Sequence, residues 1–211
     1  MTGKFVVIEG IDGVGKTTQI NRAIKHYSEI LGDQLVSTKD LGGSKLGEAL
    51  REILYKVVPS SDMAFGVLDL LFLAGHVQNW HTLVKPAIST GKFVISDRWW
   101  FSQFAYGPVR GAHPDVEDTY TKMKGGWPDL LIYMHGDPYE LVARANARAD
   151  ANVHQKKKTW NDAELQLRVH QKYIELFSRY KGFCSICVDE KNPDDVWQEI
   201  KEAIDDLLAM R

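Results

Sequence analysis

Apolar and polar positions follow two different periods along this chain. Five short runs are apolar and rich in β-branched residues, at 5–8, 35–36, 93–95, 130–132 and 186–188. The longer segments between them show helical periodicity, clearest at 18–31, 46–57, 64–87, 139–149, 162–180 and 193–210. This alternation of strands and helices predicts an α/β fold in which helices cover both faces of a parallel sheet.

The length of 211 residues predicts one domain, residues 1–211, because a chain of this size buries one good core and contains neither an internal repeat nor a linker. One segment interrupts the periodicity: residues 149–159 have no apolar repeat and include Lys156, Lys157 and Lys158. Such a charged stretch is most often a solvated surface loop. Because it follows a predicted helix that carries arginines, we also consider a closing lid at approximately residues 144–160.

Composition and charge exclude several classes of function. The formal net charge of −2 gives no general attraction to a phosphate polymer, so we expect no nucleic acid partner. No apolar run approaches the roughly 20 residues that span a bilayer, and the N-terminus lacks a signal-peptide pattern. We therefore expect a soluble, cytoplasmic protein with no membrane partner. Cys184 and Cys187 lack two further zinc ligands at suitable spacing, which favours two reduced thiols over a metal site.

Residues 10–17, Gly-Ile-Asp-Gly-Val-Gly-Lys-Thr, match the phosphate-binding P-loop between a predicted strand and a predicted helix. The glycines let successive backbone N–H groups and the helix N-terminus face the oxygens of a triphosphate. Lys16 adds positive charge at the β and γ phosphates, and Thr17 offers its hydroxyl to the Mg²⁺ ion that bridges them. The candidate ATP-binding residues are Gly10, Asp12, Gly13, Val14, Gly15, Lys16, Thr17 and Thr18.

A P-loop alone does not distinguish a kinase from a GTPase, another ATPase or a helicase. The chain has no Asn-Lys-x-Asp signature for reading guanine, and a motor ATPase would usually be longer. Asp97 and Arg98 follow the buried run at 93–95, at the carboxyl end of a strand, where open parallel sheets bind ligands. Asp97 can therefore hold water around Mg²⁺, and Arg98 can face a second phosphate. An incidental surface ion pair is the alternative for these two residues.

The order and spacing of these motifs resemble thymidylate kinase over nearly the whole chain. The resemblance includes residues 5–13, 40–43, 47–51, 71–76, 97–98 and 102–106. It continues through residues 128–130 and 137–138, and through the two arginines of the predicted helix at 139–149, to the closing helix after Pro193. Beyond the P-loop no single motif is specific, and the resemblance depends on their order.

The resemblance implies a three-layer P-loop NTPase fold with an open five-stranded parallel sheet and a short lid, assembled as a homodimer. It also implies a nucleoside monophosphate kinase that uses ATP and Mg²⁺ to phosphorylate dTMP in deoxynucleotide synthesis. Arg98 would clamp the acceptor phosphate with Arg51, and Asp12 would reach the sugar 3′-hydroxyl. Phe72 would stack on the base, and Tyr106 would exclude ribonucleotides. The implied substrate-binding residues are Asp12, Asp40, Arg51, Phe72, His76, Arg98, Gln103 and Tyr106.

Arg144 and Arg148 lie four residues apart in a predicted helix and therefore share one face. Phosphoryl transfer requires positive charge at the migrating group. In one branch of thymidylate kinases an arginine in the P-loop supplies it, and in the other the lid does. Gly13 and Val14 carry no charge here, so we expect the lid to supply it. The catalytic candidates are Lys16, Arg98, Arg144 and Arg148, with pairing to surface acids as the alternative for the last two.

Three positions depart from the family pattern and bear on the base that is bound. His76 stands where an arginine usually bonds the thymine O4, Gln103 replaces a smaller polar residue, and Leu41 replaces a proline. A neutral imidazole and a longer amide could reshape the pocket while keeping hydrogen bonds. Phosphorylation of dUMP or a 5-substituted dUMP is therefore an alternative. The others are a non-catalytic P-loop nucleotide-binding protein and a kinase that acts on a nucleoside or on bases within DNA.

Overall fold

The computed structural model describes residues 3–58, 62–64, 66–112, 114–123, 125–151, 162–178 and 183–209. Its sheet has five parallel strands in the order β2-β3-β1-β4-β5, which are β2 Leu35–Lys39, β3 Phe93–Asp97, β1 Lys4–Glu9, β4 Leu130–His135 and β5 Phe183–Cys187. All five predicted strands are therefore present, although β5 begins three residues before the predicted run at 186–188. β1 is the central strand, and its side chains from Phe5 to Glu9 are buried.

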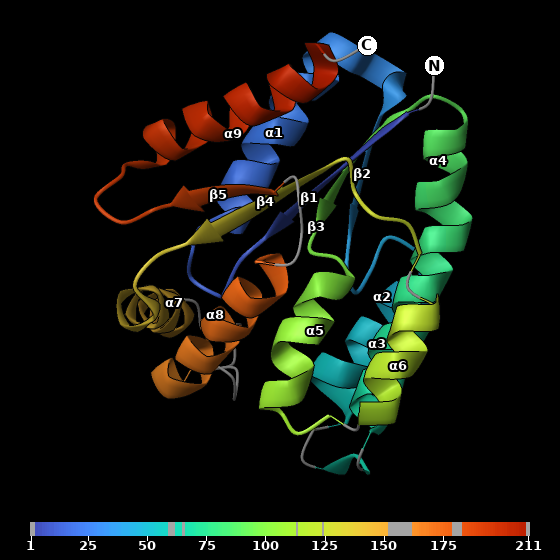
Figure 1. Ribbon diagram of the computed structural model, residues 1–211, viewed down its shortest axis with the longest axis vertical. Coiled ribbons are helices and arrows are strands. Elements are labelled where there is room, and N and C mark those ends of the chain that lie inside the picture. Colours follow the sequence, from blue (N-terminus) through green and yellow to red (C-terminus); the bar gives the residue numbers. More distant parts are fainter. Residues whose placement is uncertain are drawn as a thin grey trace.

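Helices cover both faces of this sheet, as Figure 1 shows. On one face, α1 Lys16–Leu31 packs beside α9 Pro193–Ala209, with Tyr27 of α1 against Phe93 of β3. On the other, α5 Trp100–Val109 packs beside α8 Ala163–Phe177, whose Tyr173 ring lies 5.0 Å from that of Tyr133 on β4. The remaining α-helices of the described ranges are α2 Lys45–Glu52, α3 Val67–Asn79, α4 Lys85–Ser89, α6 Pro114–Met123 and α7 Pro138–Ala151. The predicted α/β fold is confirmed.

Short turns of other helix types extend three of these helices. A π-helical turn, η2 Ile53–Val57, continues α2, so the segment predicted at 46–57 is helical but not uniformly α-helical. A second π-helical turn, η4 Trp80–Val84, joins α3 to α4 within the segment predicted at 64–87. A 3₁₀ turn, η1 Gly32–Gln34, leads from α1 into β2.

The helical periodicity does not predict α5 or α6, although both are present. α5 contains Gly107 and Pro108, two residues that weaken a helix interior, and has apolar residues on more than one side. Its N-cap residue, Trp99, provides no side-chain cap of its own. The signals that mark a helix within its own sequence are therefore missing from α5.

The predicted lid lies only partly within the described residues. α7 continues to Ala151, two residues beyond the predicted end at 149. Residues 152–161, with Lys156, Lys157 and Lys158, lie outside the described ranges. α8 begins immediately afterwards, where the Asp162 side chain accepts the backbone N–H of Leu165 at 2.9 Å.

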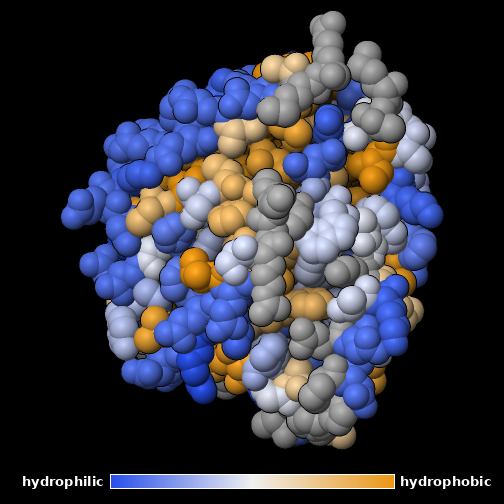
Figure 2. Space-filling model, viewed as in Figure 1, coloured by the Kyte–Doolittle hydropathy of each residue, from blue (hydrophilic) through white to orange (hydrophobic). Residues whose placement is uncertain are grey.

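The outer surface of α9 is strongly hydrophilic, and apolar residues appear between it and the helices on the opposite face of the sheet (Figure 2). This arrangement is expected where two helical layers enclose a central sheet. Within the described ranges, no helix has the length and apolar character needed to cross a membrane.

Candidate active site

The P-loop continues directly from β1 and ends where α1 begins, at Lys16. Gly10 and Gly13 have φ values of +151° and +89°, which L side chains rarely adopt. A Cβ atom at Gly13 would lie 1.9 Å from the carbonyl oxygen of Leu141, and one at Gly10 would lie 2.4 Å from that of Met134. Only glycine fits at these two positions, and the P-loop therefore packs directly against β4 and α7.

The Lys16 ammonium group lies inside this loop. Its Nζ donates hydrogen bonds to the carbonyl oxygens of Gly10 at 2.7 Å and Ile11 at 2.8 Å. Burial, followed by the positive charge of Arg98, lowers the pKa of Lys16 to about 7, although the neighbouring carboxylates oppose this shift. A triphosphate in the loop would place negative charge beside this group and raise its pKa again.

The other candidates for ATP binding lie on the same loop and on the first turn of α1. Thr17 and Thr18 are exposed, so their hydroxyls are accessible to a ligand. Val14 is buried and can contribute only its backbone N–H. The eight residues predicted from the motif therefore lie within one short segment, residues 10–18, which contains the cationic side chain of Lys16.

Strand pairing brings Asp97 beside the P-loop. β1 and β3 are parallel neighbours, and their register sets Ile8 opposite Asp97. The backbone N–H of Arg98 also donates to the Ile8 carbonyl oxygen at 3.0 Å, which extends the pairing by one residue. Two motifs that are far apart in the sequence are thus joined by the backbone of the sheet, at the carboxyl ends of its strands.

Asp97 and Thr17 fit a magnesium site that nucleotide phosphates would complete. The Oδ1 atom of Asp97 is buried and has no hydrogen-bond partner. The Thr17 hydroxyl is a second oxygen of the type that Mg²⁺ prefers. In the part of the chain that the structure describes, no cluster of three or more His, Cys, Asp or Glu side chains could hold a metal alone. Phosphate oxygens and water would therefore supply the remaining ligands.

Arg98 directs its guanidinium group at the P-loop. Its Nη2 donates to Oδ1 of Asp12 at 2.7 Å, and its Nη1 donates to Oγ of Ser102 at 3.0 Å. Arg98 has a φ of +67°, which is uncommon for a residue other than glycine and is often found at functional sites. Only 17% of its side chain is exposed. The alternative of an incidental surface ion pair does not describe this largely buried arginine.

Glu9, which the sequence pattern does not mark as a site residue, holds Arg98 in place. It is fully buried at the end of β1. Its Oε1 accepts the backbone N–H groups of Trp99 at 2.9 Å and Ser102 at 3.2 Å, and its Oε2 lies 3.7 Å from Nη1 of Arg98. Burial raises the pKa of Glu9, and the Arg98 charge and these hydrogen bonds oppose that rise. The carboxylate of β1 thus caps the N-terminus of α5, a role usually filled by a residue of the helix itself.

Tyr173 of α8 joins the same network. Its hydroxyl donates to Oε2 of Glu9 at 2.9 Å and lies 2.9 Å from Oγ of Ser102. Nη1 of Arg98 lies 3.4 Å from the same hydroxyl. α8 is the first helix after the predicted lid, so this tyrosine connects the lid side of the molecule with Arg98. A tyrosine on the buried face of an amphipathic helix gives no such indication in the sequence.

Tyr106 and Arg51 are two further residues predicted to bind the acceptor. The guanidinium carbon of Arg98 lies 5.6 Å from the centre of the Tyr106 ring. The Tyr106 hydroxyl donates to Oε1 of Gln166 at 3.1 Å, and burial raises the pKa of Tyr106, so the phenol stays protonated. Arg51 donates from Nη1 to the carbonyl oxygen of Leu41 at 3.2 Å. Tyr106 is therefore adjacent to Arg98, and Arg51 is tied to the segment after β2.

Phe72 and Gln103 are connected by an arginine that the sequence pattern does not mark. Arg110, the residue that follows α5, lies with its guanidinium carbon 5.4 Å from the centre of the Phe72 ring. Its Nη2 donates to Oε1 of Gln103 at 2.9 Å. Phe72 is half-buried and Gln103 is buried. The guanidinium group at the end of α5 therefore lies over the Phe72 ring of α3.

His76 does not occupy the position expected of a residue that contacts the base. Its side chain is fully buried, with the ring centre 4.1 Å from that of Trp99 and 6.0 Å from that of Tyr120. Its Nδ1 lies 3.4 Å from Oδ2 of Asp40, which is buried beside it. The side chains of both residues are therefore buried between α3 and the segment that follows β2, and neither imidazole nitrogen has a hydrogen-bond partner. The large neighbouring aromatic rings, which periodicity does not place, cause this burial.

The two lid arginines differ in what the structure describes. Arg144 on α7 is 46% exposed and pairs with Glu140 one turn earlier, at 3.4 Å. In this structure Arg144 therefore pairs with a surface acid, which was the alternative to a catalytic role for this residue. Arg148 lies within α7, but its side chain is outside the part that the structure describes.

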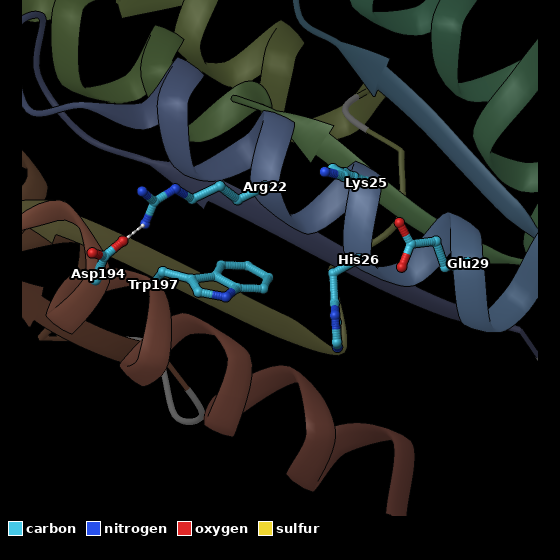
Figure 3. Close-up of a pocket in the computed structure, with 6 residues that line it drawn as sticks. All are labelled: Arg22, Lys25, His26, Glu29, Asp194 and Trp197. Atoms are coloured by element: carbon cyan, nitrogen blue, oxygen red, sulfur yellow. Dashed lines mark ion pairs between the residues drawn. The ribbon is translucent and has the colours of Figure 1, made fainter.

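A surface hollow between α1 and α9 is separate from these residues. Figure 3 shows it lined by Arg22, Lys25, His26, Glu29, Asp194 and Trp197. Arg22 is already paired with Asp194 at 2.8 Å. The hollow contains none of the predicted site residues, and we do not assign the reaction to it.

Comparison with known proteins agrees with this arrangement. The sequence matches the thymidylate kinase family over residues 8–200. The thymidylate kinase of Maridesulfovibrio salexigens is 32% identical over an alignment of 206 residues that covers 95% of this chain and 94% of that protein. The thymidylate kinase of Oleidesulfovibrio alaskensis is 30% identical over an alignment of 213 residues that covers 98% of this chain and 99% of that protein.

A solved structure shares the fold at a lower level of sequence similarity. The thymidylate kinase of Ehrlichia chaffeensis superposes with a TM-score of 0.75 at 23% identity, covering 97% of this chain and 99% of its own. This likeness confirms the predicted P-loop NTPase fold. Because the family match spans most of the chain and the relatives match over nearly their whole lengths, the protein belongs to the thymidylate kinase family of nucleoside monophosphate kinases.

Proposed function

We propose that this protein transfers the γ-phosphoryl group of ATP to dTMP, forming ADP and dTDP. The observation that carries the proposal is the 2.7 Å ion pair between Asp12 of the P-loop and Arg98 after β3. This ion pair joins the P-loop, which would hold the donor phosphates, to Arg98, which would bind the acceptor phosphate. It therefore supports two phosphate sites that are one side-chain contact apart. The assignment of dTMP as acceptor is supported by the relatives named thymidylate kinase.

In the proposed reaction, an oxygen of the dTMP phosphate attacks the γ-phosphorus. The bond from that phosphorus to the β,γ-bridging oxygen breaks, and ADP leaves. Lys16 holds the β and γ phosphates, and Arg98 orients the acceptor phosphate for in-line attack. Arg98 would exchange its contact with Asp12 for the acceptor phosphate, so that the Asp12 carboxylate can accept the sugar 3′-hydroxyl. The partial exposure of Arg98 supports this exchange.

We propose Mg²⁺ as the accompanying ion, with Asp97 and Thr17 as its protein partners. The buried Oδ1 of Asp97, which has no hydrogen-bond partner, supports this assignment. When bound, the ion would offset the charge of the β and γ phosphate oxygens. Asp97 would act mainly through water, because Mg²⁺ usually keeps several water ligands.

Arg144 and Arg148 would supply the positive charge at the migrating group when the lid, approximately residues 144–160, closes. The exposure of Arg144 supports this role, because a surface pair with Glu140 is weak and can be exchanged for a phosphate contact. The lack of charge at Gly13 and Val14 in the P-loop also supports it. The two arginines share one face of α7, so one closing movement would bring both toward ATP.

We further propose a homodimer that uses α2, α3 and α6. These helices contact one another through α3 and expose the apolar side chains of Leu46, Val67, Leu70 and Met123, next to the exposed Ile53 of η2. An exposed apolar surface of this kind often marks a protein interface. Sedimentation should therefore show a dimer, and Leu70→Glu should shift it toward monomer; an unaltered assembly in that variant would contradict this surface.

An ADP-release assay with dTMP tests the proposed activity. We expect dTMP to accelerate ATP consumption and dTDP to accumulate in equal amount with ADP. Lys16→Ala should lower the rate by at least ~10² to 10³, because the donor phosphates lose their main side-chain charge. ATP consumption that dTMP does not accelerate would instead support a non-catalytic nucleotide-binding protein. A strong preference for a 5-substituted dUMP would favour the modified-pyrimidine alternative.

A further inference from the structure

We propose that Gln166 of α8 is a positioning residue that holds the Tyr106 ring against position 2′ of the acceptor sugar, and thereby sets the preference for deoxyribonucleotides. The inference deepens the proposed function and rests on it, because it places the acceptor phosphate at Arg98. The guanidinium carbon of Arg98 lies 5.6 Å from the centre of the Tyr106 ring. An acceptor held by Arg98 would therefore have this ring close to its sugar.

Gln166 is the amide on the buried face of α8. The buried residues of this helix are Gln166, Val169, Tyr173 and Phe177, which are three or four positions apart and so share one face. The Gln166 side chain is fully buried. An amide in the protein interior costs free energy unless it is hydrogen-bonded. Burial of apolar surface alone therefore does not account for a glutamine at this position.

The Tyr106 hydroxyl is a partner of this amide. It donates to Oε1 of Gln166 at 3.1 Å. Burial raises the pKa of Tyr106, so the phenol keeps the proton that it donates. The Tyr106 ring itself is only half-buried on α5. The bond therefore ties a ring beside Arg98 to a side chain that is enclosed in the protein.

This bond determines the direction of the Tyr106 ring. A tyrosine on a helix has two common rotamers about its first side-chain torsion. The bond to Gln166 selects one of them, because the amide is held on the buried face of α8. The Tyr173 ring packs beside Tyr106, with the ring centres 6.4 Å apart and the planes at 85°. Without the bond, the Tyr106 ring could turn and leave room for a 2′-hydroxyl.

Other contacts keep α8 in place without Gln166. The Tyr173 hydroxyl donates to Oε2 of Glu9 at 2.9 Å and lies 2.9 Å from Oγ of Ser102. These contacts also surround Arg98, whose Nη1 lies 3.7 Å from Oε2 of Glu9. Substitution of Gln166 should therefore change sugar selection, whereas the position of Arg98 and the use of dTMP should be preserved.

The test compares dTMP with 5-methyluridine monophosphate, which differs from dTMP only in its 2′-hydroxyl, at saturating ATP and magnesium. In Gln166→Leu, the ratio of kcat/KM for the ribonucleotide over dTMP should rise by about 2- to 5-fold, the effect of one neutral hydrogen bond. The kcat for dTMP should change little. Gln166→Glu retains an acceptor oxygen and should keep the wild-type ratio. Gln171→Leu, the same substitution at an exposed position of α8, is the matched control and should also keep it.

A double-mutant cycle separates positioning of Tyr106 from a general effect on α8. Tyr106→Phe removes the other partner of the same bond and should raise the ratio by a similar factor. The variant with both substitutions, Tyr106→Phe and Gln166→Leu, should show no larger gain than the single variants, because both remove one interaction. Gains that multiply would show that the two residues act independently, and would overturn the proposal.

Two other results would also overturn the role of Gln166. One is a folded Gln166→Leu variant with the wild-type ratio, and Gln166→Met provides the same test if the Leu variant does not fold. The other is a wild type that uses both nucleotides equally well, because there would be no selection for the residue to set. A wild type that fails to phosphorylate dTMP would instead overturn the proposed function itself, so the failures are distinguishable.

Discussion

Oε1 of Glu9, at the end of the central strand, accepts the backbone N–H of Trp99 at 2.9 Å. The same oxygen accepts the N–H of Ser102, so a strand residue caps the helix that follows Arg98. We expect Glu9→Gln to destabilise the protein by about 1–3 kcal/mol, because the amide contributes a donor where the carboxylate accepts several hydrogen bonds. Urea denaturation measures this change.

The same substitution should also lower kcat/KM for dTMP, because Arg98 loses the carboxylate 3.7 Å from its Nη1. Glu202→Gln is the control, since Glu202 is exposed on α9. If Glu9→Gln matched the control in both stability and dTMP kinetics, the cap would not position Arg98.

ATP binding should take up a proton at pH 8. The pKa of Lys16 is about 7 in the ligand-free protein, below its ordinary value of 10.5, so the amine is mostly neutral at pH 8. Phosphate oxygens beside it favour the charged form and raise that pKa. Titration calorimetry in buffers of different ionisation enthalpy measures the number of protons taken up on ATP binding. This number should be smaller at pH 6, where the Lys16 amine is already protonated. Equal proton counts at both pH values would contradict the shifted pKa.

Replacing Tyr106 with alanine should improve the use of UMP relative to dUMP by about 10-fold, if the ring excludes the 2′-hydroxyl by contact. Tyr106→Phe is the matched control, because it removes the hydrogen bond to Gln166 but keeps the ring. The relevant quantity is the ratio of kcat/KM for the two nucleotides. A gain in the Phe variant equal to that in the Ala variant would assign sugar selection to the hydroxyl instead.

His76→Ala should lower stability without relaxing base specificity. The imidazole is fully buried against Trp99 and Tyr120, so its removal leaves a cavity costing about 2–4 kcal/mol. Urea denaturation reports the loss, and His81→Ala, at an exposed position in η4, is the control. The ratio of kcat/KM for dTMP over dUMP should not change. A changed ratio with unchanged stability would return His76 to the base pocket.

The strands and the P-loop could be predicted because their signals are local. A run of apolar residues marks β1, and the glycines of the loop fit only where the backbone passes β4 and α7 closely. The positions of Asp97 and Arg98 also followed from their place after a buried strand. Their roles in the reaction stay predictions, as does the role of Arg51.

The residues that sequence reasoning missed depend on partners from distant segments. Glu9 reads as the end of an apolar run, yet its hydrogen-bond donors are Trp99, Ser102 and Tyr173. The sequence of α5 contains no capping residue, because Glu9 of β1 caps the N-terminus of this helix. Arg110 reads as a surface residue after a helix, and only the packing of α3 on α5 brings it to Phe72.

The pairing of Ile8 with Asp97 has a consequence for how the enzyme could be altered. The donor and acceptor phosphates would be held by residues directly after β1 and β3, so the hydrogen-bonded register of these strands sets the span across which the phosphoryl group travels. A slip of one residue would move Arg98 by about 3.3 Å along the strand, as much as the contact distance needed for in-line attack. Exchange of the lid between relatives should therefore change how fast the group is transferred, whereas a single insertion in β3 should abolish transfer even where the chain still folds.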